Sequence, residues 1–387
     1  MKEKIQQLSE KYFARVVALR REIHAHPELS HHEFNTAKLV ATELNKLGLE
    51  VQTEIAGTGV VAMLRGKNPE SKCTALRADM DALPITEENN CDYKSQKDGV
   101  MHACGHDVHT ANLLGVAMVL SELKDEIEGT IKFIFQPAEE KIPSGAEAMI
   151  AAGVLKNPKP SKIFGWHVHP EMEAGEVGFC SGKFMASADE IYLTVIGKGG
   201  HAAQPHNFVS PLLIASEILM ALKKFTDLST PTVLSFGRIE GNGATNVIPE
   251  QVTLQGTLRC FDESIRQAIH EEMTSICETI ALGAGGKCEV SILKGSPVLF
   301  NDEALTAQSK EAAQDYLTLE KVYDLPIRMG AEDFAFYTHL VPACFYRIGV
   351  GNKAKGITAP IHSASFDIDE NALKTSVGLM SWLAYKA

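Results

Sequence analysis

Residues 102–123, HACGHDVHTANLLGVAMVLSEL, are the most informative part of the sequence, because a cluster of potential metal ligands is followed directly by a helical pattern. The second part of this stretch predicts a helix over 109–123 with one apolar face, formed by Leu113, Leu114, Ala117, Met118 and Leu120. Such a face predicts a buried helix, in which Met118 is a core residue and not a metal ligand. The first part places the thiol of Cys104 and the imidazole of His106, which zinc-like ions prefer as ligands, at the start of this helix. The adjacent Asp107 is of the type that fixes a histidine tautomer beside a metal.

An α/β pattern surrounds this helix. The sequence predicts helix over 12–47 and strands over 60–64 and 74–78 before it, and strands over 131–135 and 163–166 after it. Binding sites in α/β sheets form beyond the carboxyl ends of the strands, so residues distant in sequence can meet there. We therefore expect an α/β catalytic domain with a central mixed sheet flanked by helices.

Three later segments carry candidate metal ligands: 136–140 (QPAEE), 166–170 (WHVHP) and 361–363 (IHS). Adjacent Glu139 and Glu140 suit a metallohydrolase, which needs one carboxylate to hold metal and another to accept a proton from water. The alternative is a solvated acidic loop. His167 is favoured as a ligand over His169, which precedes a proline and is predicted to be structural. His362 alone is weak evidence, because a lone histidine is usually a satisfied polar group.

A second domain is predicted after residue 182, where the pattern of predicted strands and helices changes. The order is strand, helix, strand, strand, helix, strand, over 190–196, 211–225, 232–239, 252–261, 263–282 and 288–293. This is the order of a ferredoxin-like α+β unit. We therefore expect an inserted domain at 184–293 and a catalytic domain made of 1–183 and 294–387. The glycine-rich turn 197–203 lacks phosphate-loop spacing, so its glycines are expected to bring His201 close to another group.

Composition excludes several classes of protein. The chain has 387 residues, a formal net charge of −12, and 45% hydrophobic and 22% charged residues, which favours a folded two-domain protein without a nucleic-acid surface. Neither a signal peptide nor a membrane-spanning run is predicted, and eight scattered cysteines fit reduced thiols in a cytoplasm. Four N-terminal histidines are predicted to be surface or capping residues, namely His24, His26, His31 and His32.

Taken together, these motifs resemble the M20 metallopeptidase family, and within it the amidohydrolase subgroup of aminoacylases, hippurate hydrolases and auxin-conjugate hydrolases. The resemblance covers nearly the whole chain. The motifs that carry it lie at 77–84 (RADMDALP), 102–107, 136–140, 166–170, 197–206, 329–334 (MGAEDF) and 362–363. It implies a catalytic domain that binds two divalent metal ions, zinc or manganese with nickel or cobalt also possible, and an inserted domain that serves as lid and surface of a homodimer.

The resemblance also implies roles for individual residues. The implied metal ligands are Cys104, His106, Glu140, His167 and His362. Glu139 is implied as general base and acid, and Asp79 as a supporting carboxylate behind the ligands. Arg77 departs from the histidine ligand of other M20 branches, and Cys104 stands where those branches use a carboxylate.

In the inserted domain His201 is implied to stabilise an oxyanion, in cis or from a partner subunit. Asn246 and Arg259 are implied to bind a substrate carboxylate, although Arg259 equally suits an ion pair within its domain. The expected substrate is a small N-acyl amino acid, cleaved to a carboxylic acid and a free amino acid. The alternatives are a carboxypeptidase or dipeptidase with the same centre, and a non-catalytic member that binds metal or ligand.

Overall fold

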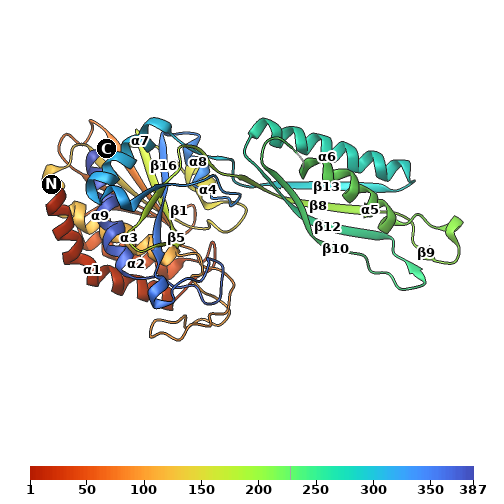
Figure 1. Ribbon diagram of the computed structural model, residues 1–387, viewed down its shortest axis with the longest axis horizontal. Coiled ribbons are helices and arrows are strands. Elements are labelled where there is room, and N and C mark those ends of the chain that lie inside the picture. Colours follow the sequence, from red (N-terminus) through yellow and green to blue (C-terminus); the bar gives the residue numbers. More distant parts are fainter. Residues whose placement is uncertain (227) are drawn as a thin grey trace. The chain divides into compact units, whose positions relative to one another are not determined.

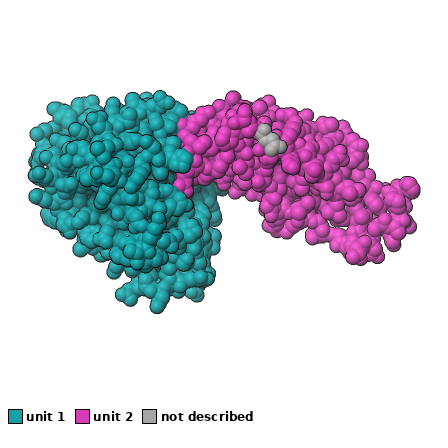
Figure 2. Space-filling model, in the orientation of Figure 1, with its two compact units in different colours: residues 1–182, 300–326, 333–387 teal, residues 183–299, 327–332 magenta. Residues whose placement is uncertain are grey.

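The computed structural model describes residues 1–226 and 228–387, and the chain divides into two compact units, coloured separately in Figure 2. The larger unit comprises Met1–Gly182, Phe300–Pro326 and Asp333–Ala387, and the smaller unit comprises Lys183–Leu299 and Ile327–Glu332. The smaller unit thus extends past the predicted boundary at residue 293. Backbone hydrogen bonds explain this extension, since Gly295 N donates to Ala188 O at 2.9 Å and Ala186 N donates to Arg328 O at 3.1 Å.

The larger unit is built on an eight-stranded mixed sheet with the order β1-β2-β4-β3-β5-β16-β6-β15 (Figure 1). Its strands are β1 (Glu50–Ile55), β2 (Gly59–Arg65), β3 (Cys73–Asp79), β4 (Thr130–Gln136), β5 (Lys162–Glu173), β6 (Val177–Phe179), β15 (Val322–Asp324) and β16 (Ala343–Gly351). The central strands β3, β4 and β5 are parallel, as are β5 and β16. Every residue of β3 and β4 is buried, as expected of strands covered on both faces.

Helices cover this sheet, with α4 and α8 on the side opposite the α1, α3 and α9 layer (Figure 1). The helices are α1 (Lys2–Ala25), α2 (Phe34–Lys46), α3 (His106–Glu122), α4 (Gly145–Ala151), α7 (Glu303–Tyr316), α8 (Ala335–Thr338) and α9 (Asn371–Lys386). Residues 106–120 of α3 are all buried, because α1 and α9 pack against it. Met118 lies in this core, as predicted.

The smaller unit is a four-stranded antiparallel sheet with two helices. Its main elements are β8 (Ser187–Ile196), α5 (Pro211–Leu222), β10 (Thr232–Glu240), β12 (Gln251–Cys260), α6 (Glu263–Gly283) and β13 (Lys287–Lys294). The strand order β10-β12-β8-β13, with every neighbouring pair antiparallel, is that of a ferredoxin-like unit. A separate two-stranded ladder joins β9 (Gly200–His201) to β11 (Val247–Ile248). Short strands β7 (Gly182–Met185) and β14 (Leu299–Asn301) occur where the chain passes between the units.

Several predicted elements have different limits in the structure. The helix predicted over 12–47 is two helices, since the chain is non-helical from His26 to Glu33 and His31 has a φ of 68°. The helix predicted to begin at residue 109 begins at His106, so this candidate ligand belongs to α3 itself. β5 is longer than predicted and runs through His167 and His169. Among the described residues, no helix combines the length and apolar character needed to cross a membrane.

Candidate metal centre

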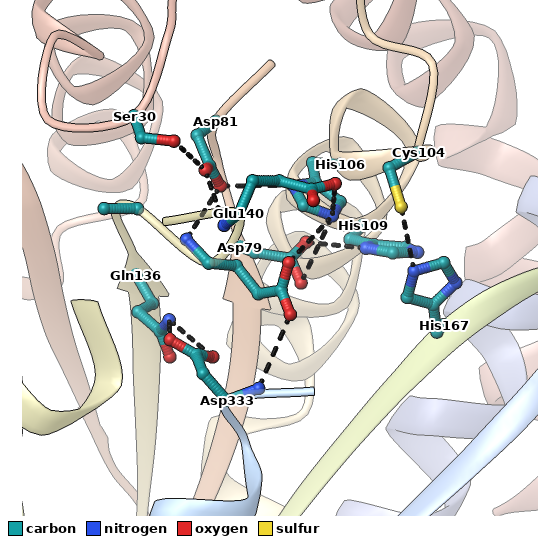
Figure 3. Close-up of polar contacts among 12 residues, drawn as sticks. Ser30, Asp79, Asp81, Cys104, His106, His109, Gln136, Glu140, His167 and Asp333 are labelled. Atoms are coloured by element: carbon teal, nitrogen blue, oxygen red, sulfur yellow. Dashed lines mark hydrogen bonds and ion pairs between the residues drawn. The ribbon is translucent and has the colours of Figure 1, made fainter. Parts of the chain in front are cut away.

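The candidate ligands converge at the carboxyl ends of the central strands, and Figure 3 shows Cys104, His106, Glu140 and His167 among them. Glu140 follows β4, His167 lies on β5, Cys104 and His106 lie at the start of α3, and His362 follows β16. The left-handed backbone of Gly105, with φ 86°, turns the chain into α3. A Cβ at this position would lie 2.6 Å from Val168 Cγ2, so only glycine lets the ligand loop pack so closely against β5.

Cys104 lies between two histidines. Its Sγ is 3.3 Å from His167 Nε2 and 3.3 Å from His362 Nε2. His362 Nε2 is also 3.3 Å from Glu140 Oε1. The structure therefore gathers a thiol, two imidazoles and a carboxylate from four segments, and sulfur, nitrogen and carboxylate oxygen are the donors that zinc and similar ions take.

His106 extends this cluster towards the paired glutamates. Its Nε2 lies 3.9 Å from Glu140 Oε1 and 4.0 Å from Glu139 Oε2. Both His106 Nε2 and Glu140 Oε1 are buried, and within residues 1–226 and 228–387 neither forms a hydrogen bond. Buried polar atoms without a hydrogen bond are uncommon, and a histidine nitrogen beside a carboxylate oxygen is a donor pair that a divalent cation takes. The residues present therefore fit a divalent metal ion.

The protonation states of the ligands follow from their surroundings. Burial, reinforced by the charge of Arg347, holds the pKa of His167 well below its usual range. Its Nδ1 lies 2.9 Å from the carbonyl oxygen of Val168 and donates to it, which leaves Nε2 as the lone-pair atom facing Cys104. Burial and the carboxylate of Glu140 raise the pKa of Cys104 well above its usual value. A metal ion that binds here must therefore displace the thiol proton.

Asp81 supports the cluster of candidate ligands, although nothing in the sequence assigned it a role. Its Oδ1 lies 3.2 Å from His106 Nδ1, and its two oxygens accept the backbone N–H groups of Glu139 and Glu140 at 3.1 and 3.0 Å. Ser30 Oγ donates to the same carboxylate at 2.6 Å. Asp81 thus fixes the ring of His106 and the backbone of the glutamate pair together. The sequence feature that could have identified Asp81 is its position just past the end of β3, two residues after Asp79.

The prediction that Asp107 fixes the tautomer of a metal ligand is wrong. Asp107 instead accepts from Arg20 Nε at 2.8 Å and pairs with His24 Nδ1 at 2.8 Å. The prediction for His24 is also wrong, since this side chain is fully buried and its other nitrogen lies 3.2 Å from Glu87 Oε1. α1 packs against α3, and this packing encloses the polar side chains that face each other there. The side chains of His26, His31 and His32 are exposed, as predicted.

Asp79 is fully buried beside the cluster. It accepts from Arg77 Nη1 at 2.6 Å and pairs with His109 Nδ1 at 2.6 Å, while His106 Nε2 is 3.9 Å away. Burial alone would raise the pKa of Asp79, but the charges of His106, His109 and Arg77 hold it well below its usual range. His109 Nε2 accepts from Val168 N at 3.0 Å, so both of its ring nitrogens are engaged and His109 is unsuited to bind metal.

The chain matches the family model described as peptidase family M20/M25/M40 over residues 75–386. It belongs to the M20 family. A solved dinuclear metal-binding M20 peptidase of Bacillus subtilis is 35% identical, with 97% of this chain and 98% of that chain covered and a TM-score of 0.83. This likeness confirms the predicted α/β fold with a separate small antiparallel domain.

Two curated M20 relatives are similarly close. N-acetylcysteine deacetylase of Bacillus subtilis is 37% identical over 380 residues, which are 96% of this chain and 97% of the relative. Thermostable carboxypeptidase 2 of Saccharolobus solfataricus is 38% identical over 378 residues, which are 96% of this chain and 95% of the relative. The predicted family and its amidohydrolase subgroup are confirmed, and the chain is an M20 metal-dependent hydrolase.

The resemblance to the M20 family also implied three residues that contact the substrate. These residues, His201, Asn246 and Arg259, lie in the smaller unit. His201 is exposed on β9, and its Nδ1 accepts from Ala203 N at 3.1 Å. Asn246 is exposed just before β11, where its backbone carbonyl accepts from Ala202 N at 3.1 Å. The ladder of β9 and β11 therefore holds these two positions side by side.

Arg259 is half-buried on β12 of the smaller unit. Burial lowers the pKa of its guanidinium, while the charges of Asp189 and Glu190 oppose that change. Asp189 itself pairs with Arg266. Among residues 1–226 and 228–387, Arg259 forms no ion pair, so the structure gives no support to the predicted alternative of an ion pair within the domain.

Proposed function

We propose that this protein is a metal-dependent amidohydrolase that cleaves N-acyl amino acids of the N-acetyl or N-benzoyl type into a carboxylic acid and a free amino acid. The proposal rests on the Nε2 of His106, which forms no hydrogen bond with the described residues and lies 3.9 Å from Glu140 Oε1 and 4.0 Å from Glu139 Oε2. One carboxylate is sufficient for metal binding. The second is the group that a hydrolase needs for proton transfer.

The proposed ligands for two divalent ions, zinc or manganese, are Cys104, His106, Glu140, His167 and His362. Such ions supply Lewis-acid chemistry, polarising the amide carbonyl and favouring the ionisation of water. The protein holds the ligand atoms ready for them, because Asp81 fixes the ring of His106 and the carbonyl of Val168 fixes that of His167. Asp79 forms hydrogen bonds with Arg77 and His109 and so adds a fixed polar layer beside the cluster.

Glu139 is the proposed proton carrier. Its Oε1 accepts from the backbone N–H of Asp333 at 3.4 Å, and its other oxygen faces His106. In this position it would take a proton from the attacking water and return it to the departing amide nitrogen. The same carboxylate therefore acts first as base and then as acid.

The smaller unit supplies the remaining proposed contacts with the substrate. The exposed imidazole of His201 would donate to the developing oxyanion, and Asn246 and Arg259 would bind the carboxylate of the amino-acid part. We propose that the protein acts as a homodimer through this unit, with His201 serving its own or a partner's site. All eight cysteines are free thiols, which supports a cytoplasmic location.

A carboxypeptidase or dipeptidase activity is the second candidate, since a relative with 38% identity is named a carboxypeptidase. A non-catalytic binding protein is less well supported, because it would have no use for a second carboxylate at the cluster. The test is to supply manganese-loaded or zinc-loaded protein with N-acetyl amino acids, N-benzoyl amino acids and dipeptides, against an EDTA-treated control. Release of amino acid from the N-acyl substrates supports the proposal, whereas cleavage of dipeptides alone favours the peptidase.

A further inference from the structure

Two buried carboxylates hold three consecutive peptide N–H groups of the loop after β4. Ala138 N donates to Glu33 Oε1 at 2.9 Å, while Glu139 N and Glu140 N donate to Asp81 at 3.1 and 3.0 Å. This loop carries the proposed proton carrier and a proposed metal ligand. Its backbone is therefore fixed by side chains that lie outside it, one after β3 and one before α2.

Glu33 joins three segments of the larger unit. It is fully buried just before α2. Besides Ala138 N, its Oε1 accepts from His31 N at 2.9 Å, and its Oε2 accepts from the hydroxyl of Thr58 at 2.5 Å. A buried side chain with such contacts has little freedom to move, so the loop at Ala138 is tied to a rigid part of the fold.

Ala138 needs this support because of its backbone conformation. Its φ of 50° lies in the left-handed region, which non-glycine residues occupy only where their surroundings hold them. Its carbonyl accepts from Gly145 N at 2.9 Å, so the residue is held on both sides. Loss of the contact with Glu33 would remove one of these two hydrogen bonds and so loosen the backbone immediately before Glu139.

We propose that Glu33 is a positioning residue of the active site, which acts through Ala138 to keep the carboxylates of Glu139 and Glu140 facing His106. It does not touch the reacting atoms. The catalytic part of this inference rests on the proposed function. The restraint that Glu33 places on the backbone of residues 138–140 can be measured without any substrate.

Glu28 provides a matched control. It is also a buried carboxylate of the segment between α1 and α2. Its Oε2 accepts from Asn35 N and Thr36 N, each at 2.9 Å, and so caps the first turn of α2. Replacement of Glu28 removes a buried charge and a cap from the same segment without removing the contact to Ala138. A general loss of stability can thus be separated from a loss of positioning.

The experiment compares Glu33→Ala, Glu33→Asp, Glu33→Gln and Glu28→Ala. The readouts are amide hydrogen exchange at residues 138–140, manganese affinity by calorimetry, melting temperature, and kcat and KM with an N-acetyl amino acid. For Glu33→Ala and Glu33→Asp we expect faster exchange, manganese affinity lowered about 10-fold or more, and kcat lowered with little change in KM. Glu33→Gln should match the wild type, because its amide oxygen accepts both N–H groups and its NH2 donates to Thr58. Glu28→Ala should lower only the melting temperature.

Wild-type exchange and manganese affinity in Glu33→Ala and Glu33→Asp would overturn the inference. So would an equal loss of manganese affinity in Glu28→Ala, since the effect would then be one of stability alone. If Glu33→Ala does not fold, the amide exchange and manganese affinity of Glu33→Asp are compared with those of Glu33→Gln, and equal values would overturn the inference. If the wild type cleaves none of the substrates, the proposed function fails, but exchange and manganese affinity still test Glu33.

Discussion

Asp81 Oδ1 lies 3.2 Å from His106 Nδ1, and the same carboxylate accepts the backbone N–H groups of Glu139 and Glu140. One buried side chain thus fixes both the orientation of the His106 ring and the position of the loop that carries the two glutamates. Asp81→Asn replaces one acceptor oxygen with an NH2 group, which cannot accept from a peptide N–H. We expect manganese or zinc affinity to fall about 10-fold to 100-fold, the range for such supporting contacts. Calorimetric titration measures this, and affinity within twofold of wild type would show that Asp81 is dispensable.

Metal should stabilise the folded protein through Cys104. An ion at 100 times its Kd adds about 2.7 kcal/mol to the free energy of unfolding when it binds only the folded state. We therefore expect zinc or manganese to raise the melting temperature of EDTA-treated protein, and Cys104→Ala to abolish most of that increase. The half-buried Cys91 provides the control, since Cys91→Ala should preserve the increase. An unchanged increase in Cys104→Ala would mean that the metal binds elsewhere.

In the smaller unit, stability should depend on Asp189. This buried carboxylate accepts from Arg266 Nε at 2.9 Å and pairs with His270 Nε2 at 2.7 Å. Burial alone would raise the pKa of Asp189, but these hydrogen bonds and charges lower it below its usual value. Because the folded-state pKa lies below the unfolded value of about 3.9, the stabilisation is present above that pH and is lost as the pH falls further through the folded pKa.

Asp189→Asn should therefore cost about 3 kcal/mol of unfolding free energy near pH 7, since it leaves Arg266 buried without its main partner. Urea denaturation at pH 7 and at successively lower pH measures this, and the gap between variant and wild type should shrink below about pH 4. The exposed Glu190 provides the control, because Glu190→Gln should cost little. A gap that stays constant through acid pH would contradict the assignment.

The candidate metal cluster was predictable in part, because Cys104, His106 and His167 are residue types that metal ions prefer, while the full set was implied by the resemblance to the M20 family. The structure brings together the side chains of all five candidates, namely Cys104, His106, Glu140, His167 and His362. The βαββαβ order of the smaller unit followed from regular periodicity. These features depend on local patterns, which a single sequence displays.

The supporting contacts were not predictable, because they depend on how distant segments pack. His24 resembles a surface residue in sequence, yet the packing of α1 on α3 buries it against Asp107. Glu33 and Ala138 lie 105 positions apart, and only the folded chain brings them together. The break between α1 and α2 was missed because helical periodicity continues on both sides of it.

The most direct test of the central claim is hydrolysis of an N-acetyl amino acid by wild type and Glu139→Gln, both loaded with manganese and shown to hold equal amounts of metal. The glutamine side chain has the shape of the carboxylate but cannot take a proton, and general acid–base catalysis contributes about 10²-fold to 10⁴-fold. We expect metal-dependent release of amino acid by the wild type and a loss of at least about 100-fold in the variant. Equal turnover by the two proteins would contradict this expectation.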